Sequence, residues 1–466
     1  MPHHELVIIG TGSGNTLLTE HLDGVDIGII EAGRFGGTCL NVGCIPTKMF
    51  VLPADRVVES AEAERIGVTV TAARAHWAAV RDRVFGRIDP IASGGEEYRK
   101  SQPHVTVYKA EARFTGERTL ALSTGEEVTA DRIVVATGSR AVGLDVPGLE
   151  SPDPSRGLHT SDTVMRLDTL PERMVIIGGG FVACEFAHVF AGFGVEVIQL
   201  QRSAHLLKNE EDEVSATYTT VSADRYDLRL QTVATKAIHD GRTWTVSTQG
   251  PDGTVEIETD TILLAVGRVP NSDRVGAGSG GIEVDHHGLI VVDDQLRTTA
   301  EKVWALGDAS SPHQLKHVAN YEARIVAHNL AVDLGRLDAH PLTVDDRPVP
   351  HGVFGHPQIA AFGPTRAELE AAGTEFVCYT QRFSDVAYGW ALEEPHGLLT
   401  VHASPDGQIL AAHCIGPHAS TVIQPLIQAA TFGQHALDVA RDQYWIHPAL
   451  AEVVENALLG LPLASS

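Results

Sequence analysis

One pattern occurs twice in this chain: a short apolar strand, a glycine-rich turn, a helix and a second strand. Residues 6–31 hold the first copy, with glycines in the turn at 10–14, and residues 174–202 hold the second, with glycines at 178–180. Such a turn lets backbone N–H groups and the positive end of a helix approach a pyrophosphate. Two copies in 466 residues predict an α/β protein with two Rossmann-like dinucleotide-binding domains.

A third domain is expected at the C-terminal end. Residues 398–402 and 409–415 read as strands, and residues 421–433 and 449–458 as helices, which together predict an α+β domain. Joints rich in Pro, Gly and Ser mark the boundaries. The expected division is residues 1–146 and 268–340 for the first dinucleotide-binding domain, 147–267 for the second and 341–466 for the C-terminal domain.

The two glycine modules differ at the end of their second strand. The first ends in Glu31, whose carboxylate can accept hydrogen bonds from an adenosine ribose. The second has Gln201 and Arg202 there, with Lys208 further on. A carboxylate repels a 2′-phosphate, whereas a pair of cations binds it. The first module therefore suits FAD or NAD, and the second suits NADPH.

Charge and hydropathy exclude several classes of partner. The formal net charge of −25 disfavours nucleic acid and anionic lipid. No apolar run approaches the roughly 20 residues that cross a bilayer, and the N-terminus does not resemble a signal peptide. We therefore expect a cytoplasmic protein. In that reducing compartment a close cysteine pair favours catalysis or metal binding over a structural disulfide.

The close pair is Cys39 and Cys44. Residues five apart in a regular α-helix lie roughly 8 Å apart, but a disulfide needs Cα atoms within about 7 Å. The helix should therefore break before Cys44, as Gly43 permits, and begin again there with Pro46 in its first turn. The positive end of the new helix would favour a thiolate on Cys44. The remaining cysteines are scattered, so they are expected to be buried apolar residues and no metal site is predicted: Cys184, Cys378 and Cys414.

The segment GGTCLNVGCIPTK at 36–48 resembles the active-site signature of the glutathione reductase and lipoamide dehydrogenase family of disulfide oxidoreductases. Residues 303–308 look like that family's second flavin motif, and residues 447–452 look like its C-terminal His-Pro-x-x-x-Glu motif. Asn15, which departs from the usual third glycine, looks most like the mycothione reductase branch. The resemblance implies FAD and NADPH as cofactors, and a homodimer formed by the C-terminal dimerisation domain.

The resemblance also implies a role for each catalytic residue. Cys39 and Cys44 would form a redox disulfide, with Cys44 nearer the flavin and Cys39 attacking the substrate disulfide. His447, donated across the subunit interface, would pass protons to the leaving thiol, and Glu452 would orient it.

Further side chains are expected to contact the cofactors. Lys48 and Glu185 match the family's ion pair beside the flavin, and Phe181 would gate the nicotinamide. The expected FAD contacts are Gly10, Gly12, Ser13, Gly14, Glu31, Gly37, Thr38, Cys39, Cys44, Lys48, Thr137, Gly138, Gly307 and Asp308. The expected NADPH contacts are Gly178, Gly180, Phe181, Glu185, Gln201, Arg202, Lys208 and Gly267.

Alternatives remain for the substrate. Mycothiol disulfide is the leading expectation. An NAD-dependent lipoamide dehydrogenase is favoured by residues 315–319 and opposed by Gln201 and Arg202. A glutathione-disulfide reductase also fits an NADPH site. A non-catalytic flavoprotein sensor would not need the acid–base pair His447 and Glu452.

Overall fold

The computed structural model describes residues 1–345 and 347–463, which divide into two compact units. The expected C-terminal domain also includes residues 346 and 464–466, which lie outside the described residues. Unit 1 comprises 1–47, 81–142 and 267–346, and unit 2 comprises 48–80, 143–266 and 347–466. Two helices run across borders between these segments: α2 (Cys44–Glu62) and α3 (Trp77–Ser101).

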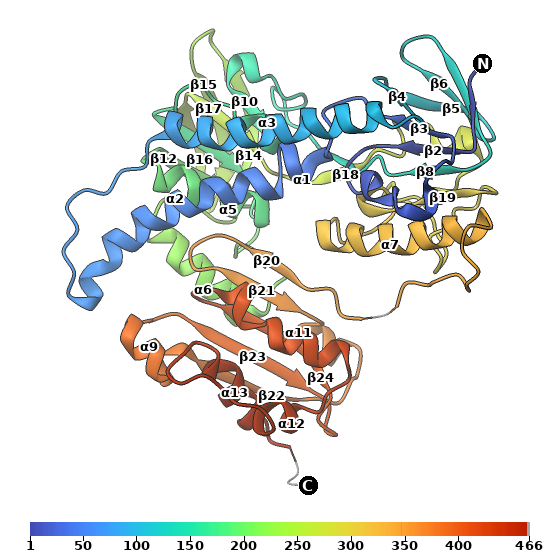
Figure 1. The fold of residues 1–466 in the computed structure, drawn as a ribbon. Coiled ribbons are helices and arrows are strands. Elements are labelled where there is room, and N and C mark those ends of the chain that lie inside the picture. Colours follow the sequence, from blue (N-terminus) through green and yellow to red (C-terminus); the bar gives the residue numbers. More distant parts are fainter. Residues whose placement is uncertain (346, 464–466) are drawn as a thin grey trace. The chain divides into compact units, whose positions relative to one another are not determined.

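Unit 1 is built on a five-stranded parallel sheet. Its central strands are apolar and buried along their whole length, as expected where both faces of a parallel sheet are covered. Segments far apart in the sequence meet in it, as the blue, cyan and orange ribbons of Figure 1 show. The strands lie in the order β19 (Val303–Ala305), β8 (Ile133–Val135), β2 (Leu6–Ile9), β3 (Ile27–Ile30) and β4 (Val105–Tyr108).

Smaller elements complete unit 1. They include a four-stranded sheet of β1 (His3–His4), β7 (Glu127–Ala130), β6 (Thr119–Leu122) and β5 (Ala112–Gly116), and a pair formed by β18 (Arg268–Pro270) and β9 (Ser139–Ala141). The helices are α1 (Gly37–Asn41) and α7 (Lys316–Asp333), with 3₁₀ turns η1 (Gly14–Leu17), η2 (Glu20–Leu22), η5 (Ala277–Gly280) and η6 (Gly307–Ala309).

The segment after the first glycine turn differs from the sequence prediction. A helix was expected between β2 and β3, but the structure has only the two 3₁₀ turns η1 and η2. Arg99 donates to both the side-chain and backbone oxygens of Asn15, and the Thr16 hydroxyl donates to the Ser13 carbonyl. These side-chain bonds compete with the backbone bonds that an α-helix would need.

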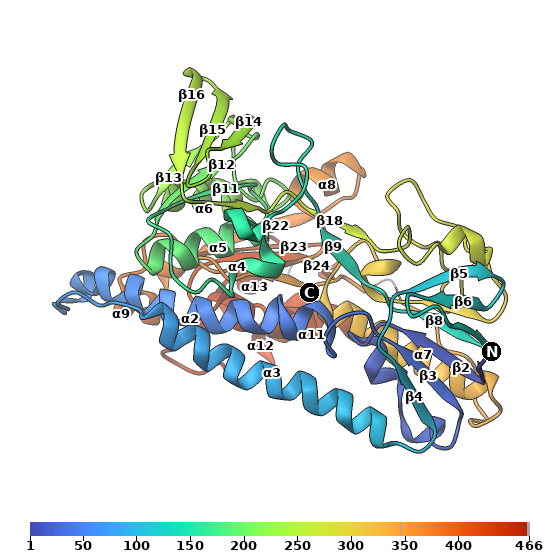
Figure 2. The same ribbon diagram turned by 90° about the horizontal axis from the view of Figure 1, so that it is seen from above.

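Unit 2 contains a second five-stranded parallel sheet, in which four strands repeat the order of their counterparts in unit 1. The edge strand differs, because it precedes the glycine turn in the sequence, whereas in unit 1 it follows. A short antiparallel sheet inserted before the last central strand of the parallel sheet stands beside it (Figure 2). The duplication predicted from the two glycine modules is therefore present in the fold. The parallel order is β10 (Leu158–Thr160), β17 (Thr261–Leu264), β11 (Arg173–Ile177), β12 (Glu196–Leu200) and β13 (Asp227–Arg229); the inserted strands are β14 (Val233–His239), β15 (Trp244–Gly250) and β16 (Gly253–Thr259).

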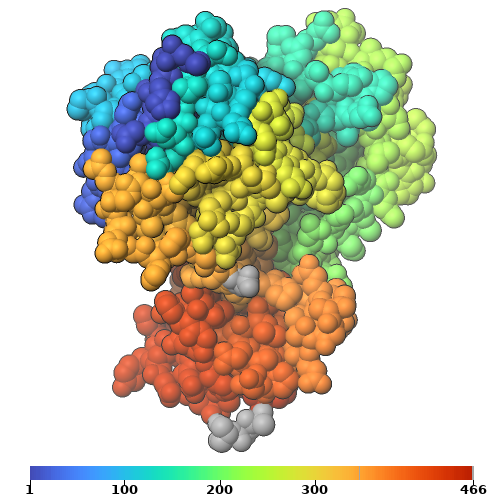
Figure 3. All heavy atoms as spheres, turned by 90° about the vertical axis from the view of Figure 1, so that its right-hand side faces the viewer, coloured from blue at the N-terminus to red at the C-terminus, as the bar shows by residue number. Residues whose placement is uncertain are grey.

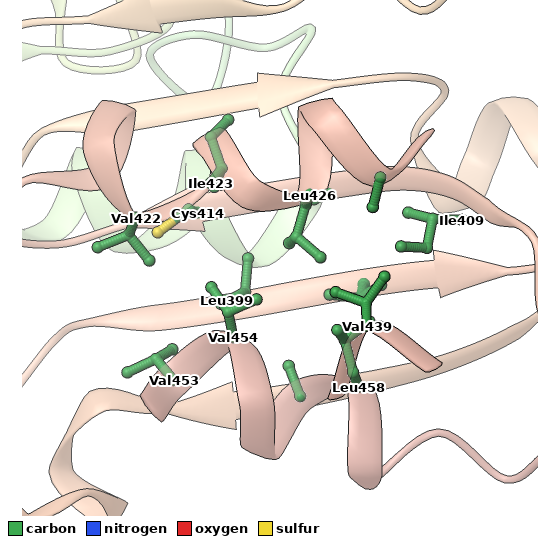
Figure 4. Packing of buried hydrophobic residues seen from close by; sticks show 14 of the residues in the cluster. Leu399, Ile409, Cys414, Val422, Ile423, Leu426, Val439, Val453, Val454 and Leu458 are labelled. Carbon is green, nitrogen blue, oxygen red and sulfur yellow. The ribbon is translucent and has the colours of Figure 1, made fainter. Parts of the chain in front are cut away.

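The C-terminal part of unit 2 is an antiparallel sheet with helices, as predicted. Its apolar core lies between one face of the sheet and the C-terminal helices, with Leu399, Leu426 and Val454 at its centre (Figure 4). The strand order is β20 (His351–Val353), β21 (Ile359–Phe362), β24 (Ile409–Ile415), β23 (Leu398–Ala403) and β22 (Val377–Arg382). Residues 351–463 are coloured from deep orange to red in Figure 3.

The opposite face of this sheet packs on a helix of the nucleotide module within the same unit. Val214 and Tyr218 of α6 (Asp212–Ala223) share a buried cluster with Leu398 and Ile415 of the sheet. The other helices of unit 2 are α4 (Ser161–Val164), α5 (Phe181–Gly192), α8 (Arg366–Ala371), α9 (Ala387–Leu392), α10 (Ala419–Val422), α11 (Gln424–Thr431), α12 (Ala436–Arg441) and α13 (Glu452–Leu459), with 3₁₀ turns η3 (Ala63–Ile66), η4 (Pro154–Arg156) and η7 (Phe383–Asp385).

None of the helices in the described part of the chain is long and apolar enough to cross a membrane.

Candidate active site

The first glycine turn is crowded by backbone on two sides. A Cβ on Gly10, which has a φ of +101°, would lie 2.3 Å from the Ala136 carbonyl oxygen. A Cβ on Gly37, at a φ of +63°, would lie 2.6 Å from the Cα of Gly12. Glycine is thus required at both positions. The close approach also brings the start of α1, which carries Cys39, against the turn.

Glu31 stands at the end of β3, where the sequence placed it. One carboxylate oxygen accepts hydrogen bonds from the backbone and the hydroxyl of Thr11, at 2.8 and 2.6 Å. The other accepts from the Gly33 N–H at 2.7 Å. These bonds fix the carboxylate beside the turn.

Helix α7 also contributes to this turn. Lys316 donates to the Ser13 hydroxyl at 2.9 Å, and that hydroxyl donates to Asn320 at 3.3 Å. Sequence reading identified Ser13 and Gly14 but missed Lys316 and Asn320. They are about 300 residues away in sequence, and the segment 315–319 was interpreted only as evidence about the substrate.

The other residues that the sequence predicted to contact FAD lie at the ends of β8 and β19. The Asp308 carboxylate accepts from the Ser139 hydroxyl at 2.6 Å, and the Gly307 N–H donates to Glu322 at 2.6 Å. Gly138 and Gly307 both have positive φ, of +64° and +67°.

The polar atoms in this region fit a dinucleotide. The hydroxyl oxygen of Thr137 is buried without a hydrogen-bond partner in the residues that the structure describes. A buried polar atom of this kind needs a partner. Together with the glycine turn and Glu31, it matches the hydroxyls and phosphates of FAD, for which these residues were predicted.

The cysteine pair has the local structure that its spacing predicted. Helix α1 ends at Asn41, Val42 and Gly43 break it, and Cys44 is the first residue of α2. Cys39 and Cys44 stand as thiols. The hydrogen bond of the Cys39 thiol with Cys44 raises the pKa of Cys39, and burial raises it further. Both effects disfavour the thiolate form of Cys39.

The other cysteines follow the prediction only in part. Cys184 and Cys414 are fully buried, and desolvation raises the pKa of the Cys184 thiol to about 12. Cys378 is instead half-buried, and its sulfur accepts a hydrogen bond from Arg366 at 2.8 Å. It lies on β22 beside a polar cluster, which its sequence neighbours do not reveal.

The second glycine turn leads directly into α5. A Cβ on Gly178, at a φ of +136°, would lie 2.3 Å from the Ala265 carbonyl oxygen. Gly180 is the N-cap of α5, and a Cβ built there meets nothing within 4 Å. Phe181 begins the helix and is 49% exposed. The turn therefore presents an open helix N-terminus, which suits a pyrophosphate.

Gln201 and its neighbours lie at the end of β12. Gln201 is buried, and its amide donates to the His205 carbonyl at 3.1 Å. Arg202 and Lys208 are exposed, and neither makes a hydrogen bond or an ion pair with any described residue. Two exposed cations at this edge fit a 2′-phosphate. Gly267, also predicted to contact NADPH, is the first residue of the last segment of unit 1.

Lys48 and Glu185 form the ion pair that the sequence suggested. The Lys48 ammonium lies 2.6 and 2.7 Å from the two carboxylate oxygens of Glu185. Glu185 is 4% exposed and also accepts from the Phe354 N–H at 2.9 Å. Lys48 stands 4.6 Å from the centre of the Phe354 ring. Phe354 was missed by sequence reading because its contribution is a backbone N–H.

His447 and Glu452 are paired at the C-terminal end. Nδ1 of His447 lies 2.6 Å from Glu452, which also accepts from the Ala449 N–H at 3.0 Å. Partial burial raises the pKa of Glu452, but the hydrogen bonds from His447 and Ala449 together hold it below its ordinary value. The tautomer with a proton on Nδ1 leaves Nε2 of His447 as the free acid–base atom.

Comparisons with known proteins agree with this geometry. The family model described as "Pyridine nucleotide-disulphide oxidoreductase" matches residues 4–323, and the dimerisation domain of the same family matches residues 349–458. A mycothione reductase of Mycobacterium tuberculosis is 45% identical over 99% of this chain and 100% of its own. A dihydrolipoyl dehydrogenase of Haloferax volcanii is 32% identical over 97% and 96%.

Solved structures show the same similarity. The HOCl-induced flavoprotein disulfide reductase RclA from Escherichia coli matches with a TM-score of 0.85 and 25% identity, covering 98% of this chain and 100% of its own. Family models and relatives together cover nearly the whole chain. The chain therefore belongs to the pyridine nucleotide-disulphide oxidoreductase family, as an enzyme that uses FAD and NAD(P)H.

Proposed function

We propose that this enzyme reduces mycothiol disulfide to mycothiol with electrons from NADPH. The observation that carries the proposal is the 45% identity to a mycothione reductase along the full length of both chains. The dihydrolipoyl dehydrogenases are more distant, at 32% identity or below among those compared. The reaction consumes one disulfide, NADPH and a proton, and yields two thiols and NADP⁺.

The coenzyme preference rests on the end of β12. Gln201 places no carboxylate beside an adenosine ribose, and Arg202 and Lys208 are unpaired within residues 1–345 and 347–463. Both cations are available for charge-assisted bonds to a 2′-phosphate. Gly178, Gly180 and the start of α5 would hold the pyrophosphate.

FAD, when bound, supplies the two-electron connection between the nicotinamide and the sulfur pair. Gly10, Gly12, Ser13 and Gly14 would hold its pyrophosphate and Glu31 its adenosine ribose. Further contacts are proposed from α1, the segment after it and the ends of β8 and β19: Gly37, Thr38, Lys48, Thr137, Gly138, Gly307 and Asp308. The ion pair of Lys48 with Glu185 would place a cation near the flavin.

The chemistry of the disulfide falls to Cys39 and Cys44. Cys39 must lose its proton before it can attack, because the thiolate is the nucleophile; its hydrogen bond with Cys44 raises its pKa, so a base is needed. The Cys39 sulfur then bonds to one sulfur of the substrate, and the other leaves as a thiolate that needs a proton. The Cys44 thiolate next attacks the Cys39 sulfur, closing the Cys39–Cys44 disulfide and releasing the second substrate sulfur as a thiolate, which takes the proton that the overall reaction consumes.

His447 is proposed to carry these protons. Glu452 orients its ring, and 70% of the His447 side chain is exposed in the single chain. The dimerisation domain supports a homodimer. In the proposed assembly, the histidine of one subunit takes the Cys39 proton of the other and returns it to the leaving thiolate. We place the enzyme in the cytoplasm, where thiols are kept reduced.

The test follows NADPH oxidation by the purified, FAD-loaded enzyme with three substrates in parallel: mycothiol disulfide, glutathione disulfide and lipoamide. NADH replaces NADPH in matched reactions. Turnover of mycothiol disulfide above the other two, with NADPH preferred, is expected. Turnover of lipoamide with NADH would instead assign the enzyme to the dihydrolipoyl dehydrogenases.

A further inference from the structure

A buried polar cluster of unit 2 lies outside all the residues assigned above. Glu211 is the N-cap of α6, His402 lies on β23, and His413 lies on β24. Their exposed fractions are 7%, 0% and 2%. One potential ligand atom from each lies within 4.8 Å of the others.

The strand register places the two histidines on one face. His402 pairs with Ala411, and Thr400 pairs with His413, so the histidines are diagonal neighbours across β23 and β24. This face is opposite to the apolar core of the C-terminal helices and packs on α6. The start of α6 therefore places Glu211 against the two imidazoles on this face of the sheet.

Hydrogen bonding inside the cluster is incomplete. Neither ring nitrogen of His402 has a hydrogen-bond partner, and Nδ1 of His413 has none, among residues 1–345 and 347–463. A fully buried imidazole with two unsatisfied nitrogens is rare in folded proteins and calls for a partner. This is the observation that points to a ligand.

The spacing of the atoms suits a shared metal ion better than direct hydrogen bonds. Nε2 of His402 lies 3.5 Å, and Nε2 of His413 lies 3.9 Å, from Oε2 of Glu211. A charge-assisted hydrogen bond would be about 2.7–2.9 Å long. Two ligands on a tetrahedral Zn²⁺ with bonds of about 2.0–2.1 Å lie about 3.3–3.4 Å apart. The two Glu211 distances would contract by some tenths of an ångström on binding, and the two histidine nitrogens, which lie within 4.8 Å of each other, would close by up to about 1.5 Å.

We propose that Glu211, His402 and His413 form a binding site for one divalent transition-metal ion, with Zn²⁺ as the occupant. Two imidazoles and a carboxylate are a donor set that Zn²⁺ favours. Because the site is buried and none of its three side chains is assigned to the disulfide chemistry, the ion would be structural. It would tie the start of α6 to the sheet.

Neighbouring groups complete the surroundings of this site. Nε2 of His413 lies 3.1 Å from the Pro364 carbonyl oxygen. Binding of a metal to Nε2 would shift the ring proton to Nδ1, and the Pro364 carbonyl oxygen would remain close to the metal. The Arg366 N–H donates to Glu211 at 2.9 Å, which holds the carboxylate in place. Cys378 pairs directly with His402 across β22 and β23, which makes its sulfur the alternative fourth donor.

The site would act on the loop that carries the coenzyme cations. Glu211 follows Lys208 by three residues, and Leu207 in the same loop donates to the Gly179 carbonyl at 2.8 Å. Fixing Glu211 therefore limits the motion of the segment between β12 and α6. We expect slower amide hydrogen exchange in residues 203–211 when the metal is bound.

The test uses the full-length, FAD-loaded enzyme without an affinity tag, stripped with a chelator and kept in its disulfide form. In that form Cys39 and Cys44 cannot ligate a metal. Binding of Zn²⁺ is measured by elemental analysis after dialysis, and binding of Co²⁺ by its visible absorption. One equivalent per chain is expected, together with a Zn²⁺-dependent rise in Tm.

Three variants locate the metal: Glu211→Gln, His402→Gln and His413→Gln. Each should lose at least tenfold in Zn²⁺ affinity while retaining FAD. His351→Gln serves as the control, since His351 is on β20 of the same sheet and hydrogen-bonds to Glu210 instead. If a histidine variant fails to fold, zinc-edge X-ray absorption of the unaltered enzyme reports the ligands directly.

Absence of Zn²⁺ and Co²⁺ binding by the folded enzyme would overturn the proposal. Undiminished binding in folded variants would do the same, because the metal would then lie elsewhere. An absorption spectrum dominated by sulfur ligands, with no imidazole, would also contradict it.

Discussion

Nδ1 of His447 lies 2.6 Å from the carboxylate of Glu452, while 70% of the histidine side chain stays exposed. One ring nitrogen is thus fixed within the chain, and the other faces outward. This arrangement leaves the second ring nitrogen available for the proton transfer that the proposed function requires.

Replacing His447 should slow the reduction of the disulfide substrate but not the reduction of the enzyme by NADPH. His447→Gln is expected to lower kcat for disulfide turnover by about 10²- to 10⁴-fold, the usual contribution of a general acid–base. Reduction of the enzyme by NADPH, followed in a stopped-flow spectrometer, should stay within about twofold of the unaltered rate. Equal losses in both half-reactions would argue against a role confined to the disulfide.

Glu452 should act through His447, as a positioning residue. Glu452→Gln removes the negative charge beside Nδ1 that would stabilise an imidazolium, so the pH profile of kcat should shift. The kcat loss should be smaller than that of His447→Gln. The pH profile of kcat distinguishes this role from a structural one, which would lower kcat without moving the profile.

Coenzyme choice should depend on Arg202 and Lys208. Losing one hydrogen bond to a charged phosphate costs about 1.5–3 kcal/mol, so Arg202→Ala should raise KM for NADPH by about 10- to 100-fold. KM for NADH should change little. Lys236→Ala is a matched control, because Lys236 is an exposed cation on β14 of the same module.

Removing Lys48 should destabilise unit 2. Glu185 would then be left buried with only the Phe354 N–H as a donor. Breaking a fully buried ion pair costs about 3–5 kcal/mol, and because the Lys48 side chain is 34% exposed we expect about 1–3 kcal/mol for Lys48→Met. Thermal unfolding checks the loss, and the double variant Lys48→Met, Glu185→Leu should recover part of it.

Glu322 should make stability depend on pH. Desolvation raises its pKa from 4.5 to about 7, and the charge of Asp308 adds to the rise. Because the folded pKa is raised, the stabilising contribution is fully present below about pH 4.5 and is lost as pH rises through about 7. The rise of 2.5 pKa units (7 − 4.5) corresponds to about 3 kcal/mol.

The variant Glu322→Gln isolates this effect, since its amide oxygen can still accept from the Gly307 N–H. Its stability relative to the unaltered protein should increase by up to about 3 kcal/mol between about pH 5 and about pH 8. Urea unfolding at the two pH values gives the comparison. A pH-independent difference would show that Glu322 does not titrate in this range.

The sequence predicted features that are encoded within short segments. The glycines at 10 and 178 implied the two parallel sheets, and the spacing of Cys39 and Cys44 implied the break at Val42 and Gly43. Both follow from covalent geometry and backbone conformation, which a local pattern records. The pattern around Asn15 also led to the expectation of mycothiol disulfide, which the 45% identity to a mycothione reductase supports.

Other features depend on contacts between distant segments. Arg99 donates a hydrogen bond to Asn15, which lies 84 residues earlier in the chain. The segment that begins near Asn15 forms 3₁₀ turns in place of the expected first helix. The cluster of Glu211, His402 and His413 joins three elements whose sequences carry no metal-binding spacing. Only the register of β23 and β24, and the packing of α6, bring those side chains together.

The second glycine turn has a consequence for the evolution of coenzyme preference. A Cβ on Gly179 would lie 2.3 Å from the side-chain nitrogen of Gln201, so the two positions share one space. A larger residue at 179 would displace the Gln201 amide from its hydrogen bond with the His205 carbonyl unless a smaller residue replaced Gln201. Substitutions at these sites should therefore appear in pairs among descendants of this sequence, and a change of coenzyme preference at position 201 is constrained by its glycine neighbour.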